Sequence, residues 1–125
     1  MKIALDVAEN EFIRFAENMD LISEQEEYKN EKEIIIKAIC NGSLTINEDG
    51  EPVFTPQRSK VCEPLTFREP DGATVMAMDK KKKGEEIGKL FSVMGDICKV
   101  HPNTFAKMAW RDLKVPQAIV TLFLA

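Results

Sequence analysis

The single histidine of the sequence, His101, is its best candidate for a general base. An imidazole exchanges protons near neutral pH, which general acid–base catalysis requires. No nucleophile or orienting acid accompanies His101 in the nearby sequence, and Pro102 and Asn103 follow it as they would at the end of a helix. We therefore expect His101 to cap a helix end, and we expect neither a catalytic residue nor an enzyme.

The three cysteines, Cys40, Cys62 and Cys98, are candidate nucleophiles or metal ligands. A reactive thiol needs an electropositive setting, and a zinc site needs ligands at short, paired spacings. The three cysteines are far apart in sequence and form no C-x-x-C pair. This pattern predicts reduced thiols in a cytosolic protein, with no metal and no cofactor.

Four adjacent lysines, Lys80 to Lys83, could bind phosphate or an anionic partner. Adjacent residues spread around a helix instead of lining one face, so the run is more typical of a solvated helix end. Lysines there also interact favourably with the negative pole of the helix dipole. The turn Glu69–Gly72 lacks the glycine-lysine-hydroxyl sequence of a phosphate-binding loop.

Charge and hydropathy exclude two classes of partner. The 125 residues carry a net charge of −4, which argues against a nucleic-acid binder, since such a protein presents a basic face. No apolar run approaches the roughly 20 residues that a membrane-spanning helix needs. With 44% hydrophobic residues, the chain has enough apolar material for one domain over residues 1–125.

The two halves of the chain differ in charge. Residues 1–57 hold 13 acids and 5 bases, a net charge of −8, whereas residues 58–125 hold 8 acids and 12 bases, a net charge of +4. Opposite charges steer association. The halves could attract each other within one chain, or attract a neighbouring copy head to tail, and we expect a homo-oligomer.

The first 42 residues read as an acidic helical part. Apolar residues recur at three- and four-residue steps from Val7 to Ile22, which predicts an amphipathic helix. Ser23 and Glu26 have the spacing of a capping box and would open a second helix that reaches about Cys40. The dipeptide Asn41-Gly42 tolerates the left-handed conformation and would close it.

Residues 43–70 read as the β part. Ser43–Ile46 and Pro52–Thr55 flank Asp49-Gly50, which supplies the positive backbone angles of a hairpin turn. Val61–Arg68 would add a third strand, which Pro64 confines to an edge or a bulge.

Residues 71–125 read as helical again. The clearest helix has an apolar stripe at i, i+3, i+4, i+7, i+10 and i+11 and is broken by His101-Pro102-Asn103. The expected helices are Ala73–Lys83, Glu85–Val100, Thr104–Leu113 and Pro116–Leu124. The predicted fold class is α+β, mostly helical with a small antiparallel β-hairpin or three-stranded sheet in the middle.

Apolar side chains of the helical part are candidates for binding a partner. Trp110 is the only tryptophan, and the last helix is very apolar for a chain end. Such residues build either a core or an exposed groove, and spacing alone leaves both open. The candidate partner-binding residues are Ile87, Leu90, Phe91, Met94, Trp110, Ile119, Leu122 and Phe123.

Residues 61–125 resemble a family of tail assembly chaperones from long-tailed bacteriophages and prophages. The resemblance rests on an extended strand and turn, then a Met-x-Met-Asp-Lys helix segment, and an Arg-Asp-Leu before the last apolar helix. In this sequence those motifs are Pro64–Ala73, Met76–Lys80 and Trp110–Leu113.

The resemblance implies a non-enzymatic role. Chaperones of this family coat the tape measure protein, a very long, helical and apolar chain, and keep it soluble until the tail tube polymerises. It also implies a location in the host cytoplasm and absence from the mature virion. The alternative is a small acidic phage protein that binds and inhibits a host factor, for which the charge and the lack of catalytic groups are equally suitable.

Overall fold

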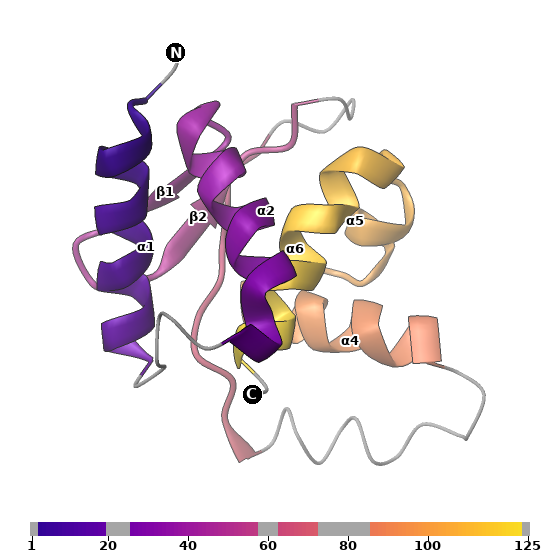
Figure 1. Ribbon diagram of the computed structural model, residues 1–125. Helices are drawn as coiled ribbons and strands as arrows, with labels where there is room; N and C mark the ends of the chain where they lie inside the picture. Colours follow the sequence, from indigo (N-terminus) through magenta and orange to yellow (C-terminus); the bar gives the residue numbers. More distant parts are fainter. Residues whose placement is uncertain (1–2, 20–25, 58–62, 73–85, 124–125) are drawn as a thin grey trace.

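The computed structural model describes residues 3–19, 26–57, 63–72 and 86–123. In these ranges it has the expected α+β class: helices surround a small antiparallel sheet with the strand order β1-β2-β3 (Figure 1). The elements are α1 (Leu5–Asn18), η1 (Glu26–Tyr28), α2 (Lys29–Cys40), β1 (Leu44–Ile46), β2 (Pro52–Phe54), β3 (Leu65–Thr66), α4 (Glu86–Cys98), α5 (Asn103–Ala106) and α6 (Trp110–Phe123).

Helix α1 is amphipathic, as its sequence pattern predicts. It begins at Leu5, two residues before the expected start, and Ile22 lies outside the described residues. Ala8, Phe12, Phe15 and Ala16 are buried on one side. Helical periodicity places these four residues on a single stripe, so the opposite side of α1 faces water.

Helix α2 ends as the sequence predicts. Gly42 has φ 85°, and its N–H donates to the carbonyl of Ile39 at 3.1 Å. The N–H of Ser43 donates to the carbonyl of Ala38 at 3.1 Å. These two bonds form a Schellman motif, which satisfies carbonyl groups at the helix end. At the other end Ser23, half of the expected capping box, lies outside the described residues.

The hairpin of β1 and β2 is confirmed. The strands are antiparallel, with Leu44 opposite Phe54 and Ile46 opposite Pro52. These four side chains are buried, and Thr45 between them is exposed. This alternation places one face of the hairpin on the core. Pro52 is tolerated because it begins its strand and needs no N–H in the ladder there.

Asn47 organises the hairpin turn. Its side-chain Oδ1 accepts the N–H groups of Asp49 at 3.0 Å and of Glu51 at 2.9 Å. Gly50 has φ 80°, while Asp49 keeps a negative φ. Only the glycine therefore supplies the left-handed conformation that we expected from the Asp-Gly pair.

Replacing Gly50 with alanine should lower the free energy of unfolding by about 1–3 kcal/mol. A Cβ atom at this position would be strained by the positive φ and would lie 2.7 Å from Cγ of Asn18 in helix α1. Urea denaturation followed by circular dichroism measures the effect. Gly72→Ala is the control, because a Cβ there meets no atom within 4 Å. Equal stability of the two variants would contradict the prediction.

Strand β3 pairs with β2, with Phe54 opposite Leu65 and Val53 opposite Thr66. It lies at the edge of the sheet, as Pro64 predicts. The described strand is only two residues long, and Val61 and Cys62 of the expected strand lie outside the described residues. The expected helix Ala73–Lys83 and its lysine run lie outside them as well.

Helix α4 ends in a second Schellman motif, before the expected break at His101. The N–H of Val100 donates to the carbonyl of Gly95 at 2.9 Å, and that of Lys99 to the carbonyl of Asp96 at 3.3 Å. Lys99 has φ 60°, in the left-handed region that favours glycine. The chain therefore turns back sharply along α4 after Cys98.

The predicted helix boundaries over residues 104–124 were wrong. In place of one helix over Thr104–Leu113 the structure has the short α5 and a break, and α6 then runs through Pro116 instead of beginning there. Proline inside a helix removes one backbone hydrogen bond. Pro116 is almost completely buried, so apolar packing offsets that loss.

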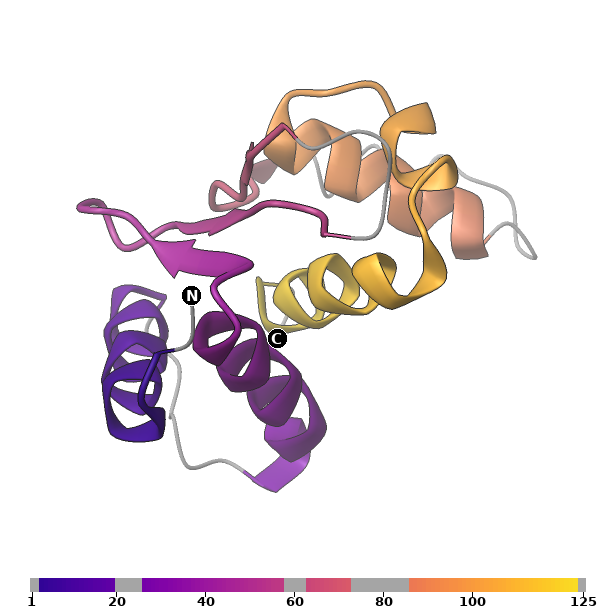
Figure 2. The same cartoon turned by 90° about the horizontal axis from the view of Figure 1, so that it is seen from above.

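Helix α6 packs against elements from both halves of the chain. It contacts α2, α4 and β2, while α1 packs on α2 and on β1. Figure 2 shows α1 and α2 side by side, with α6 beyond α2. Phe15 of α1 makes edge contacts with Phe12 and with Phe123 of α6, at ring-centre distances of 6.2 and 5.8 Å. Among the described helices none is long and apolar enough to cross a membrane.

Candidate functional site

His101 does not cap the end of the preceding helix, contrary to our expectation, because α4 ends at Cys98 with backbone hydrogen bonds; His101 contacts the start of α5 instead. The side chain is exposed, and its Nδ1 accepts the backbone N–H of Asn103, the first residue of α5, at 3.1 Å. This bond satisfies a free donor at a helix start. Within the described ranges no group of three or more His, Cys, Asp or Glu side chains could hold a metal ion.

Cys98 is a poor nucleophile. Burial raises the pKa of its thiol to about 12, and the positive charge of Arg68 offsets only part of this rise. The thiol therefore stays protonated at neutral pH, and a thiol reacts through its thiolate. Cys40 is a half-buried free thiol, and Cys62 lies outside the described residues.

Half of the predicted partner-binding residues belong to the core. The buried side chains, each at most 8% exposed, are Met94, Ile119, Leu122 and Phe123. Helix α6 is apolar on several sides because neighbouring elements cover it on several sides. In this conformation these four side chains hold the molecule together and are not available to another chain.

The other predicted residues are more accessible or lie outside the description. Trp110, the first residue of α6, is 64% exposed. Leu90 and Phe91 of α4 are half-buried against the core. The side chain of Ile87 is not among those that the structure describes. Trp110 is therefore the predicted residue with the largest apolar area open to a partner.

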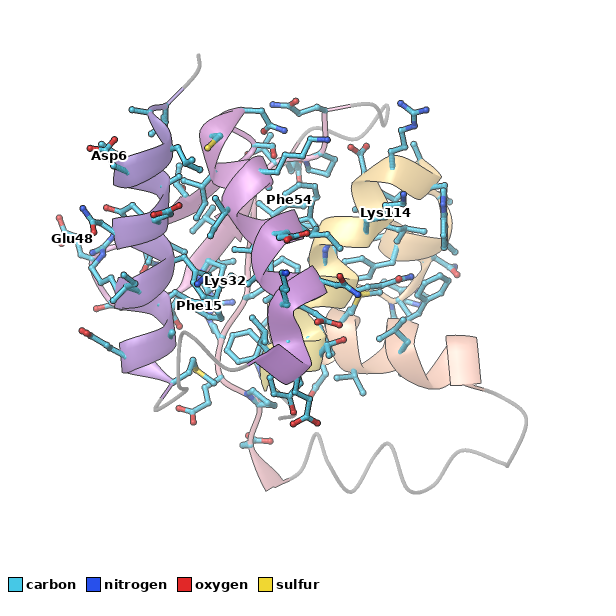
Figure 3. The ribbon with its side chains drawn as sticks, viewed as in Figure 1. Asp6, Phe15, Lys32, Glu48, Phe54 and Lys114 are labelled. Carbon is cyan, nitrogen blue, oxygen red and sulfur yellow. The ribbon has the colours of Figure 1, made fainter. Side chains whose placement is uncertain are left out.

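A cavity of about 470 Å³ opens between the end of α2, the end of β2 and the start of α6. This volume is within the usual range for ligand pockets, about 300–1,000 Å³. Apolar side chains from three elements line it, among them Ile34, Ala38, Phe54 and Val115. In Figure 3 Phe54 lies between α2 and α6. We refer to this cavity as the basic cleft, because of the cations at its edge.

Three cationic side chains line the basic cleft: Lys37 from α2, and Arg111 and Lys114 from the first turns of α6. All three are exposed. The one acid in the lining, Asp112, is only 5% exposed, and its carboxylate accepts the backbone N–H of Gln57 at 3.2 Å. The cleft therefore has an excess of positive charge at its edge, while Ala38 and Phe54 are buried in its wall and its open surface is more polar than apolar.

Sequence reasoning did not find the basic cleft. Lys37 is far in the sequence from Arg111 and Lys114, and the contact of α2 with α6 brings them together. The sequence contains only a weak indication of the cleft. Arg111 and Lys114 are three residues apart, so they lie on one side of a helix and could form part of a basic surface.

Comparisons of the sequence with protein-family models and with curated proteins, and of the chain with solved structures, gave no match.

Proposed function

We propose that this protein is a phage tail assembly chaperone that binds the tape measure protein and keeps it soluble during tail assembly. The observation that carries the proposal is the exposure of Trp110, 64%, within the Trp-Arg-Asp-Leu motif of the family resemblance. Tryptophan is the residue most often found at the energetic centre of an interface. A large apolar ring held in water at a helix start is available to an apolar client.

The proposed client contact is centred on Trp110, with Leu90 and Phe91 of α4 as secondary contacts. These two side chains keep part of their surface accessible, and α4 packs against α6. Met94, Ile119, Leu122 and Phe123 act indirectly, because they fix α4 and α6 in place. The contact surface is thus smaller than the sequence suggested.

A contact of this size requires many copies of the chaperone. One buried tryptophan contributes about 2 kcal/mol or more at the centre of an interface. A single copy can shield only a short stretch of a very long client, so stable coverage depends on several copies that bind together. The proposal is therefore compatible with weak binding by one isolated molecule.

Trp110→Ser should lower the affinity for the tape measure protein of the same phage by about 30-fold, which corresponds to about 2 kcal/mol. Co-expression is the test: the wild-type chain should keep the long protein in the soluble fraction, and the variant should leave most of it insoluble. Thr121→Ala is the matched control, since Thr121 is an exposed residue of the same helix. A client that stays insoluble with the wild-type chain would overturn the proposal.

The single tryptophan also gives a direct readout of binding. Its ring is in water in the free protein, so an apolar client that covers it should shift the indole emission to shorter wavelength and protect it from acrylamide. A soluble tape measure segment without tryptophan is the titrant. Binding with unchanged emission would place the client elsewhere and would remove Trp110 from the contact.

A further inference from the structure

The three cations of the basic cleft are unpaired in the part of the chain that the structure describes. Lys37, Arg111 and Lys114 make neither an ion pair nor a side-chain hydrogen bond there. By contrast Arg14, elsewhere on the surface, is paired with Glu11. In a protein with a net charge of −4, three unpaired cations around one cavity form a group of donors that the fold itself does not use.

The three cations come from two walls of the cleft. Arg111 and Lys114 are three residues apart on α6, so they lie on one side of that helix. Lys37 comes from α2, which packs on α6. It also borders a second hollow with Glu9 and Glu33, but it forms an ion pair with neither of these two described acids. A ligand in the basic cleft can therefore be held from both sides.

The cationic side chains set the charge of the cleft, and the helix dipoles do not. The start of α6, a positive pole, and the end of α2, a negative pole, both border the cavity, so the two poles offset each other. The carbonyls of Ala38 and Ile39 at the end of α2 already accept the N–H groups of Ser43 and Gly42. They are therefore not free to repel an anion at short range.

Hydrogen bonds within the lining use its acceptors more than its donors. Asn41 Oδ1 accepts the N–H of Ser43 at 2.9 Å, and Ser43 Oγ donates to the carbonyl of Ala38 at 3.2 Å. The carboxylate of Asp112 accepts the N–H of Gln57. Because the amide oxygen of Asn41 faces Ser43, its NH₂ group is directed away from that backbone. The cleft thus presents mainly N–H donors, which suit a ligand that is rich in acceptors.

We propose that the basic cleft binds a compact multivalent oxyanion, either a phosphate ester or a polycarboxylate. The forked guanidinium of Arg111 binds two oxygens of such a group, and Lys37 and Lys114 supply further charge. The cavity of about 470 Å³ has room for it. The open surface of the cleft is more polar than apolar, so the ligand has no large apolar part.

The inference goes beyond the proposed function, because Trp110 does not line the cleft. A bound oxyanion would join α2 to α6, and a ligand that binds only the folded chain stabilises it. Oxyanion binding and client binding can thus be lost separately, by changes at different residues.

Isothermal titration calorimetry of the full chain at low salt tests the site. Inorganic pyrophosphate and citrate are the probes, one for each source of the oxyanion, and acetate is the comparison with a single charge. We expect saturable binding of pyrophosphate or citrate, about tenfold or more tighter than that of acetate, because several charged contacts form together. Binding of pyrophosphate alone would identify a phosphate ligand, and binding of citrate alone a polycarboxylate. No saturable binding of either probe, or equal binding of acetate, would overturn the inference.

Removing one cation at a time tests where the oxyanion binds. Arg111→Gln and Lys114→Gln should each weaken the binding about tenfold, because each change removes one charged donor from the cleft. Lys107→Gln is the matched control, since it removes the same charge from an exposed lysine outside the cleft. This control should bind like the wild type. An equal loss in all three variants would show a diffuse attraction instead of a site.

Asn41→Asp tests the role of the neutral donor. The change keeps an oxygen for the N–H of Ser43 and replaces the NH₂ group with a second acceptor. It should weaken the binding about tenfold or more, because a carboxylate then faces the ligand. Unchanged binding by this variant would contradict the placement of the oxyanion in the cleft.

Nuclear magnetic resonance locates the bound probe directly. On addition of pyrophosphate or citrate, the backbone amide signals of Ser43 and Gln57 in the lining should shift, and that of Gly50 in the hairpin turn should not. Shifts confined to residues outside the cleft would rule the site out. Trp110→Ser should leave oxyanion binding unchanged, and Lys37→Gln should still keep the tape measure protein soluble, so that failure of this inference is distinct from failure of the proposed function.

Discussion

Replacing Phe15 with alanine should lower the free energy of unfolding by about 3–5 kcal/mol. The ring is completely buried and lies where α1 meets the rest of the core. It makes edge contacts with Phe12 of its own helix and with Phe123 of α6. Deleting the ring leaves a cavity that these neighbours can fill only in part.

Urea denaturation followed by far-ultraviolet circular dichroism measures this loss. Tryptophan fluorescence is a poor probe here, because Trp110 is already exposed in the folded protein. Ile13→Ala is the matched control: it lies two residues earlier on the same helix with 38% of its side chain exposed. It should cost about 1 kcal/mol or less. Similar losses for both variants would mean that α1 does not pack through Phe15.

The elements with strong local signals could be predicted from the sequence. Helix α1 has a stripe of apolar residues, Gly42 follows the end of α2 in the left-handed conformation, and the hairpin turn contains Gly50. In each case the signal lies within a few residues of the element, so that no knowledge of the remaining fold is needed.

The boundaries of α5 and α6 could not be predicted by the same reasoning. Proline near the start of an apolar segment usually marks a first helical turn, which placed the expected start of the last helix at Pro116. The structure begins that helix six residues earlier, at Trp110. Tertiary packing allows the helix to continue through Pro116, because this residue is buried in the core and its burial outweighs the missing hydrogen bond.

Of the residues predicted to bind a partner, Trp110 is largely exposed and Leu90 and Phe91 are half-buried, whereas the four buried ones could not be told apart from them by sequence. An all-round apolar helix such as α6 has the same sequence pattern whether it is buried or offered to a partner, and its neighbours in the fold decide between the two. The basic cleft depends on the contact of α2 with α6. A distant pair such as Lys37 and Lys114 leaves no local pattern in the sequence.

Gly95 makes the tight corner after α4 possible. A Cβ atom on residue 95 would lie 2.8 Å from the carbonyl oxygen of Val100 and 3.2 Å from the nitrogen of Pro102. Both are backbone atoms of the segment that turns back along α4. They cannot move aside as a flexible side chain would, so the whole segment would have to shift.

Gly95→Ala should therefore destabilise the protein by about 1–3 kcal/mol, the usual range for overpacking. Alanine favours a helix by about 1 kcal/mol over glycine, so a net loss would show that the close approach of the corner outweighs helix propensity. Thermal and urea denaturation followed by circular dichroism measure the change.

Lys99→Gly tests the same corner in the opposite direction. Lysine at φ 60° is in a conformation that costs about 1 kcal/mol in any residue with a Cβ, and glycine adopts it without strain. We expect Lys99→Gly to raise the stability by up to about that amount. If Gly95→Ala stabilised the protein and Lys99→Gly destabilised it, the tight turn after α4 would be contradicted.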